Sequence, residues 1–426
     1  MKRTLIRASM RLFSAWIRRR AEAPASPGPA ALPRALQEAQ GVLVVALAEA
    51  GDMVLLSPFI RALRHLVPSA RIALVTLPGS APLYENCPEV DEVLSYPATT
   101  RLLRPIQLPR RAREFAARSL RGRFDVAIVP RWDTDQHLAG VVALYSGAAR
   151  RVAFSEHVNP RKQALNAGFD RWFTDILESE GVGHEVERHL TLLQALGAPV
   201  EPARLALWPT AADHALAGQA LPDVADRRRL VALGVGAAHP KRRWPIARFA
   251  EIGLQLQREI DAHVLIVGGP GDVQAQDRLL GALGPSATGL AGQLTLPQTA
   301  AALEHCHLFV GNDSAPLHLA ASAGVPCVEI SCHPADGDPL HHNAPERFGP
   351  WGVPSTIVRP MRATPPCAGS CSASGPHCIL EVSPSTVSRA SVALWNAADG
   401  RTLESSSERS TSSSHATTIR ARDIRE

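Results

Sequence analysis

The sequence lacks long hydrophobic runs and is poor in aromatic residues. Only 5% of its 426 residues are aromatic, and no apolar stretch approaches the ~20 residues that a transmembrane helix needs. Within residues 1–20 the longest stretch without a charge runs from Leu12 to Ile17, which is too short for the core of a signal peptide. These absences predict a cytoplasmic protein.

Cysteine is also scarce. The seven cysteines, an odd number in a long chain, exclude a small scaffold built on disulfides. Four of them lie in or beside apolar segments, where a thiol usually serves as a small buried side chain; they are Cys87, Cys306, Cys327 and Cys332.

Basic charge is concentrated at the N-terminus. The chain has 45 Lys and Arg against 40 Asp and Glu, and residues 1–20 hold seven of the bases and no acid. The rest of the chain therefore carries a slight negative charge. A nucleic-acid-binding protein would carry its positive charge on the folded body, so we expect no nucleic-acid partner.

The basic N-terminal segment has apolar residues at roughly helical spacing, among them Leu5, Ile6, Phe13, Trp16 and Ile17. Bases combined with an apolar face are typical of a helix that lies in the plane of an anionic membrane. The segment thus indicates peripheral binding to the cytoplasmic face of the inner membrane. The alternative is a misplaced start codon, in which case these residues are not translated. A proline-rich linker follows at residues 23–33.

Short β-branched runs then alternate with helical patterns, in two series separated by a linker that contains Pro199, Pro202 and Pro209. This alternation predicts an α/β fold with two Rossmann-like domains, each a doubly wound parallel sheet, that face each other across a cleft. The predicted strands cover residues 42–46, 71–76, 125–129, 230–235, 263–267, 308–310 and 327–330. The predicted helices cover 54–66, 102–121, 184–196, 246–258, 273–283, 297–305 and 315–323.

We expect four regions along the chain. An N-terminal extension and linker occupy residues 1–40, and the two domains occupy 41–207 and 208–398. Residues 399–426 are rich in serine and threonine and poor in apolar residues, so they are predicted to form a disordered tail.

The turn after the first predicted strand carries Gly51 and Asp52. Ligands of doubly wound sheets bind beyond the carboxyl ends of the strands, and this is the first such turn. Asp52 is therefore a candidate general base at a cleft edge. The alternative is a purely structural helix cap, a role that aspartate often plays.

Two strand-to-helix turns of the second domain carry groups suited to anions. Lys241, Arg242 and Arg243 precede a helix and could clamp a diphosphate, although such a run is more often a solvated loop. In the second turn Asp313 or Ser314 could cap a helix, or the backbone amides there could hold a phosphate. His318 on this helix is more typical of a partly buried structural histidine than of a catalyst.

Taken in order, these segments resemble glycosyltransferase family 9, the ADP-heptose:lipopolysaccharide heptosyltransferases. The resemblance covers about residues 41–395 and rests on six stretches in the order of the family. These are VLVVALAEAGDMVLLSPFIRALRHLVPSARIALVT, GHEVERHLTLLQALG, KRRWPIARFAEI, LIVGGPGD, VGNDSAPLHLAASAGVPCVEI and PPCAGSCSASGPHCILEVSP.

The resemblance implies a GT-B fold and an inverting transfer without a metal or other cofactor. It implies Asp52 as the general base that deprotonates the acceptor, Arg242 or the adjacent Lys241 as the phosphate contact, and Asp313 with the amides of Ser314 and Ala315 as the holder of the sugar nucleotide. Gly51 and His318 are assigned to the same substrate sites. Arginines 101, 104, 110, 111 and 131 are weaker candidates for contacts with the acceptor.

The implied donor is ADP-heptose and the implied acceptor is the inner core of lipid A-linked lipopolysaccharide. Two alternatives stay open: the same chemistry on a protein acceptor, as in autotransporter heptosyltransferases, and a non-catalytic scaffold that binds a nucleotide sugar. Neither the acceptor position nor the oligomeric state follows from the sequence.

Three departures from the family pattern bear on these expectations. Ala315 replaces a glycine, which predicts strain if that position needs a positive φ. Ala48 replaces a small hydroxyl residue and removes one hydrogen bond to the donor. The C-terminal cysteine cluster has only Cys367, Cys371 and Cys378, with Ser374 nearby. Three irregularly spaced cysteines make a poor tetrahedral zinc site, so no metal is expected there. None is expected either at the loop histidines His333, His341 and His342.

Overall fold

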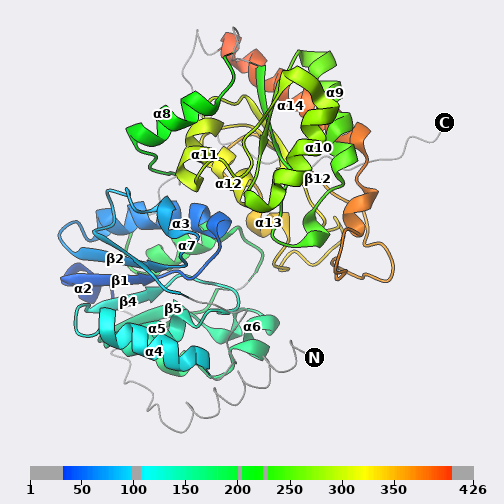
Figure 1. Cartoon of the computed structure of the whole chain (residues 1–426). Coiled ribbons are helices and arrows are strands. Elements are labelled where there is room, and N and C mark those ends of the chain that lie inside the picture. The colour runs from blue at the N-terminus through cyan, green and yellow to red at the C-terminus, as the bar shows by residue number, and fades with distance from the viewer. Residues whose placement is uncertain (1–31, 98–106, 180, 200–203, 224–228, 405–426) are drawn as a thin grey trace. The chain divides into compact units, whose positions relative to one another are not determined.

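The computed structural model describes residues 32–97, 107–179, 181–199, 204–223 and 229–404. The basic segment 1–20, Arg101 and Arg104 lie outside these residues. The chain divides into two compact units, Met1–Ala203 and Arg204–Glu426. Each unit holds one six-stranded sheet in which all neighbouring strands are parallel (Figure 1). The predicted α/β fold with two doubly wound parallel sheets is confirmed.

The first unit has the strand order β3-β2-β1-β4-β5-β6. Its strands are β1 (Gly41–Val45), β2 (Arg71–Thr76), β3 (Glu92–Ser95), β4 (Val126–Val129), β5 (Arg150–Phe154) and β6 (Asp175–Leu177). Its helices are α2 (Leu32–Gln37), α3 (Ala50–Leu66), α4 (Gln107–Ser119), α5 (Ala139–Ser146), α6 (Pro160–Leu165) and α7 (Glu185–Ala195). Figure 1 shows α3 and α7 on one face of the sheet and α4 and α5 on the other.

The second unit has the strand order β12-β11-β10-β7-β8-β9. Its strands are β7 (Leu230–Gly234), β8 (His263–Val267), β9 (Ala287–Gly289), β10 (Leu308–Asn312), β11 (Cys327–Ile330) and β12 (Ser355–Val358). Its helices are α8 (Ala211–Ala220), α9 (Ile246–Ile260), α10 (Val273–Leu283), α11 (Leu296–Leu303), α12 (Ala315–Ser322), α13 (Pro345–Phe348) and α14 (Pro384–Glu404).

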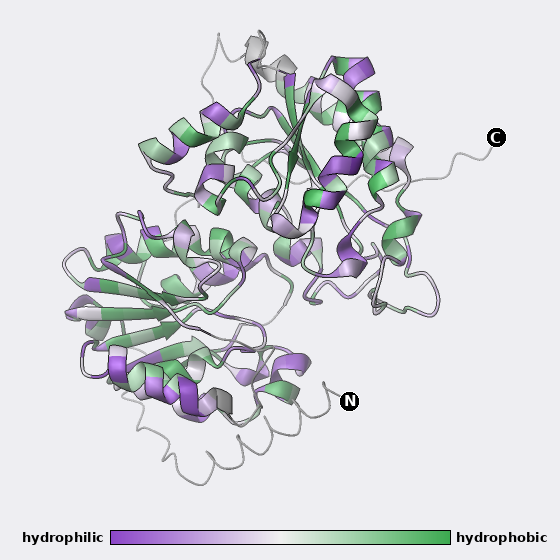
Figure 2. Cartoon of the chain, viewed as in Figure 1, coloured by the Kyte–Doolittle hydropathy of each residue, from purple (hydrophilic) through white to green (hydrophobic). Residues whose placement is uncertain are grey.

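Burial on both faces explains why the central strands are uninterrupted apolar runs. All five residues of β1 and all five of β7 are buried. In the first unit, Leu43 and Val45 pack with Ala112 of α4 and Val142 of α5. Figure 2 shows hydrophobic strands flanked by helices whose outer faces are hydrophilic. None of the helices in the described part of the chain combines the length and apolar content that a membrane span requires.

Two expectations about element boundaries need correction. Helix α3 begins at Ala50, four residues before the predicted start, so Gly51 and Asp52 lie inside its first turn. Helix α14 continues to Glu404, so residues 399–404 are helical rather than part of a disordered tail. The remaining residues of that predicted tail, 405–426, lie outside the described part of the chain.

Candidate active site

The first unit places Asp52 and Arg131 together at the point where the strand order reverses. From β1 the chain continues to β2 on one side, whereas β4 pairs with β1 on the other. Such a switch point is where doubly wound sheets bind ligands. Asp52 lies in the first turn of α3, just after β1, and Arg131 follows β4. The Arg131 guanidinium donates to Oδ2 of Asp52 at 2.5 Å.

Asp52 is not the N-cap of its helix, so the alternative that it serves as a helix cap is wrong. The N-cap is Glu49, which makes no side-chain cap hydrogen bond, and Asp52 is the third residue of α3. A carboxylate in the first turn still interacts favourably with the positive end of the helix dipole. The Asp52 side chain keeps 29% of its surface exposed, so a bound ligand can reach it.

Arg131 is held in place by its surroundings. Burial lowers its pKa, but the charges of Asp52, Asp133 and Glu185 outweigh burial and raise the pKa above its ordinary value. Next to it, Trp132 is fully buried, and the Arg188 guanidinium carbon lies 3.4 Å from the centre of its ring. This cation–π contact joins the end of β4 to α7.

Lys162 stabilises the same backbone from α6. Its ammonium donates to the Phe154 carbonyl at 2.9 Å and to the Arg131 carbonyl at 3.3 Å. Burial lowers the pKa of Lys162 to about 8, while the charges of Asp135, Asp170 and Asp133 act in the opposite direction. A buried cation thus ties the carboxyl ends of β4 and β5 together beside the Asp52–Arg131 pair.

Ala48 lies at the same edge of the sheet. The Ser80 hydroxyl donates to the Ala48 carbonyl at 3.0 Å. The Ser80 hydroxyl therefore lies beside position 48, where the sequence resemblance leads us to expect a hydroxyl residue in place of Ala48. Arg110 and Arg111, by contrast, are exposed on α4, and Arg110 pairs with Glu114 at 2.7 Å.

The second unit repeats the arrangement at its own switch point, between β7 and β10. Arg242 follows β7, Asp313 follows β10, and their side chains form an ion pair of 2.9 Å. The fully buried Asn312 joins the two turns, because its amide nitrogen donates to the Val235 carbonyl at 2.8 Å and its oxygen accepts from the Trp244 N–H at 3.0 Å.

The three consecutive bases of this unit point to different partners. The Lys241 ammonium donates to the Cys371 carbonyl at 2.8 Å. Arg243 donates to the Ala237 carbonyl at 2.8 Å, and its guanidinium lies 3.8 Å from Asp272. Arg242 is the base of this run that pairs with Asp313. Because all three side chains bond to other parts of the protein, the run is not a uniformly solvated loop.

The start of α12 shows no strain at Ala315. In the described part of the chain, only Leu138 and Asp261 among the non-glycine residues have positive φ, so the expected conflict at Ala315 is absent. Ser314 is the N-cap, but its hydroxyl donates to the Asn312 carbonyl at 3.1 Å instead of capping the helix. His318 is buried within the helix.

Glu329 is a buried carboxyl residue that the sequence pattern did not single out, and it lies opposite Gly311 in the parallel pair of β10 and β11. Burial raises the pKa of its carboxyl well above the ordinary value, and the charge of Asp313 raises it further. The sequence does contain a signal for this residue, because Glu329 is a carboxyl residue inside an otherwise apolar strand. The effect of Asp313 on Glu329 depends on the register of two strands, which the sequence does not show.

Residues 115–373, more than half of the chain, match the model of glycosyltransferase family 9 (heptosyltransferase). The chain belongs to glycosyltransferase family 9. The protein is therefore a glycosyltransferase. The match includes Arg131, Lys241, Arg242 and Asp313, whereas Asp52 precedes it.

Curated relatives of this family 9 enzyme extend the match. Lipopolysaccharide heptosyltransferase 3 of Escherichia coli is 25% identical over 297 residues, which cover 66% of this chain and 80% of that protein. Lipopolysaccharide heptosyltransferase 2 of Escherichia coli K12 is 27% identical over 324 residues, which cover 71% of this chain and 86% of that protein.

Solved structures agree with the fold of the family 9 enzyme. A family 9 glycosyltransferase from Veillonella parvula superposes with a TM-score of 0.65 at 20% identity, covering 84% of this chain and 98% of that one. The Escherichia coli ADP-heptose lipopolysaccharide heptosyltransferase II superposes with a TM-score of 0.60 at 21% identity, covering 84% of this chain and 99% of that one.

Proposed function

We propose that the protein transfers heptose from ADP-heptose to the inner core of lipopolysaccharide, with inversion at the anomeric carbon. The curated relatives named above are lipopolysaccharide heptosyltransferases and support this donor and acceptor. Within the structure, the observation that carries the proposal is the Arg131–Asp52 pair at the switch point of the first sheet. It supplies a partly exposed carboxylate where a ligand of such a sheet binds.

In this proposal Asp52 is the general base. The Arg131 guanidinium donates to one carboxylate oxygen and holds it in place, so that the other oxygen is available to accept a proton. As the acceptor hydroxyl attacks the anomeric carbon, its proton passes to Asp52 and the bond from that carbon to the diphosphate breaks. Arg131 is a positioning residue for this step.

The second unit binds the donor in this proposal. Arg242 and the N-terminal amides of α12 contact the diphosphate, because a guanidinium and a helix N-terminus both favour an anion. Asp313 orients the Arg242 side chain through their 2.9 Å ion pair. These donors also stabilise the negative charge that develops on the departing ADP, which is the role a divalent ion plays in other transferases.

The proposal is tested by incubating the purified protein with labelled ADP-heptose and three acceptors in parallel: a heptose-deficient lipid A–core extract, a set of candidate proteins, and water. Label that appears in the lipid A–core fraction, and not with Asp52→Asn, supports the proposal. Label transferred only to protein would identify a protein heptosyltransferase. Release of free heptose at equal rates in all three arms would show that neither acceptor is the substrate.

We further propose that the enzyme works at the cytoplasmic face of the inner membrane, where a lipid-linked core is accessible. Support comes from the composition of residues 1–20, which lie outside the described part of the chain. Flotation of the full and the truncated chain with anionic liposomes tests this placement.

A further inference from the structure

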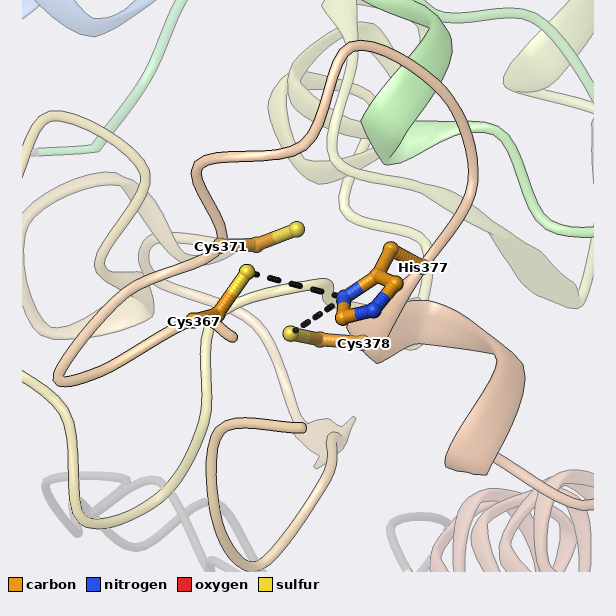
Figure 3. A group of neighbouring side chains, drawn as sticks. All are labelled: Cys367, Cys371, His377 and Cys378. Carbon is orange, nitrogen blue, oxygen red and sulfur yellow. Dashed lines mark hydrogen bonds between the residues drawn. The ribbon is translucent and has the colours of Figure 1, made fainter. Parts of the chain in front are cut away.

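Four potential metal ligands converge in the segment between β12 and α14. They are the thiols of Cys367, Cys371 and Cys378 and the imidazole of His377. Their ligand atoms all lie within 4.8 Å of one another, and Figure 3 shows the four side chains directed toward a common point. Among the described residues no other group of three or more histidines, cysteines or carboxylates brings its ligand atoms together in this way.

The distances fit a tetrahedral metal site. Nδ1 of His377 lies 3.5 Å from Sγ of Cys367 and 3.5 Å from Sγ of Cys378. With Zn–S bonds of about 2.3 Å and Zn–N bonds of about 2.0–2.1 Å, a sulfur and a nitrogen ligand on one tetrahedral zinc ion are separated by about 3.5 Å. One Nδ1 proton can point at only one sulfur, whereas a metal ion satisfies both.

The environment favours thiolate ligands. All three cysteines are buried and free of disulfide bonds, and they belong to the same apolar core as Trp244 and Ile379. The Ser372 N–H donates to Sγ of Cys367 at 3.3 Å, which stabilises negative charge on that sulfur. Three thiolates in such a buried place need a cation beside them, and the convergence of the three sulfurs and the imidazole leaves a position for one.

We propose that Cys367, Cys371, His377 and Cys378 bind one zinc ion in a closed site. Three thiolates and one imidazole form a Cys₃His set that suits this borderline-soft cation. Because all four positions are filled by protein, the ion is structural and supplies no Lewis acid to the reaction. The expectation that no metal binds here rested on the three cysteines alone and did not consider His377.

The zinc ion would fix a segment that contacts the candidate donor site. The Cys371 carbonyl accepts from Lys241. The Val382 carbonyl accepts from the Trp244 indole at 3.0 Å and from Arg248 at 2.8 Å. An ion that cross-links residues 367–378 therefore fixes the carbonyl that holds Lys241, and the cross-linked segment ends four residues before the carbonyl that holds Trp244 and Arg248. This inference concerns metal binding and does not depend on the identity of the sugar or the acceptor.

The test is elemental analysis of the full chain, expressed without a tag that binds metals and gel-filtered in metal-free buffer. We expect about one zinc per chain. His377→Ala and Cys378→Ser should lose most of it, whereas Cys306→Ser, which changes a buried cysteine of the same unit outside the cluster, should retain it. His377→Cys keeps four ligands and should also retain the metal, which separates lost ligation from general misfolding.

A second measurement uses cobalt in place of zinc. The wild-type chain refolded with Co²⁺ should show the intense visible bands of a tetrahedral thiolate site, and His377→Cys should shift these bands. The proposal is overturned if the purified wild-type chain holds no stoichiometric metal, if Cys306→Ser loses as much as Cys378→Ser, or if mass spectrometry finds a disulfide between two of the three cysteines. Iron bound stoichiometrically by the same four residues would support the site and overturn its assignment to zinc.

Discussion

The Arg131 guanidinium donates to the Asp52 carboxylate across the switch point of the first sheet, at 2.5 Å. The two residues are 79 positions apart and follow neighbouring strands, β1 and β4. Arg242 and Asp313 repeat this relationship after β7 and β10 of the second sheet. Each unit thus carries an Arg–Asp pair where its fold provides a ligand site.

Replacing Asp52 with Asn should lower the transfer rate by roughly 10²–10⁴-fold, because general-base catalysis contributes about that much. The amide keeps the shape of the side chain and an oxygen that can still accept from Arg131. Donor affinity and melting temperature should therefore change little. Steady-state kinetics and calorimetry with ADP measure the two effects.

Asp91→Asn is the matched control for this substitution. Asp91 also pairs with an arginine, Arg64, but it accepts from the Ile72 N–H at the opposite, amino-terminal edge of the sheet. Its replacement should leave the transfer rate unchanged. Wild-type turnover in Asp52→Asn, or an equal loss in both variants, would contradict the assignment of Asp52 as the base.

Replacing both Lys241 and Arg242 with Ala should weaken ADP binding by roughly 10- to 100-fold, because charge-assisted hydrogen bonds to phosphate are lost. Adenosine, which lacks the diphosphate, should lose little affinity. Isothermal titration with both ligands makes the comparison. Arg243→Ala is the control, since Arg243 points to Ala237 and Asp272. Equal losses for adenosine and ADP would show that the turn acts through folding alone.

Glu329 should make stability depend on pH. A glutamate carboxyl ordinarily has a pKa of 4.5, and burial raises the pKa of Glu329 in the folded state well above that value. The folded state therefore retains a proton that the unfolded state releases, so stability is lost as the pH rises from about 4.5 toward the folded pKa. Over this pH range the free energy of unfolding of Glu329→Gln should rise relative to that of the wild type, by at most about 1.4 kcal/mol per pH unit. Urea unfolding at several pH values measures the difference.

Glu346→Gln provides a control of opposite sign. Burial raises the pKa of Glu346, but the hydrogen bond with Arg359, a backbone hydrogen bond and the positive charge of Arg359 together outweigh burial and lower the pKa below the ordinary value. The stability that Glu346 contributes is thus present above about pH 4.5 and lost as the pH falls.

Parallel stability curves for the wild type and Glu329→Gln would contradict the prediction for Glu329. They would mean that Glu329 is ionised in the folded protein.

Removing the proposed zinc ion should weaken ADP binding without a change in any residue that contacts the nucleotide. A mercurial reagent that displaces thiolate-bound zinc frees residues 367–378, and with them the carbonyl that holds Lys241. We expect ADP affinity to fall severalfold and to recover when thiol and zinc are added back. Zinc release followed with a colour indicator should track the loss. Full ADP affinity after stoichiometric zinc release would separate the metal from the donor site.

Removal of residues 1–30 should abolish flotation with anionic liposomes. The full chain should float, and salt should weaken its binding because the attraction is electrostatic. The truncated chain begins at Ala31 so that α2 is kept, since Leu32 and Leu36 of this helix are buried. Equal flotation of both chains would show that the basic segment is not the membrane anchor.

The pattern of apolar residues predicts seven of the strands and seven of the helices, namely β1, β2, β4, β7, β8, β10 and β11, and α3, α4, α7, α9, α10, α11 and α12. Strand β2 and helix α10 lie where the pattern predicts, and β1, β7 and β10 differ by one or two residues. These elements could be predicted because strands buried on both faces must be continuously apolar, while the helices that cover them alternate polar and apolar residues. Strands β3, β5, β6, β9 and β12 were missed. Strands β3, β6 and β9 have only three or four residues, most of them partly exposed, and carry no such pattern. Strand β5 begins with two partly exposed arginines, and the edge strand β12 begins with two polar residues, so their apolar runs are too short to stand out.

Which chemical groups meet depends on the packing of the whole chain. Asp52 stood out in its own turn, but its partner Arg131 comes from a strand that is distant in sequence. The interaction of Glu329 with Asp313 depends on strand register, and His377 becomes a fourth ligand only because the chain folds back toward Cys367. Local sequence fixes secondary structure through short-range periodicity and capping. A site is built from residues that the sheet order brings together across many intervening positions, and that order follows from the packing of the whole unit.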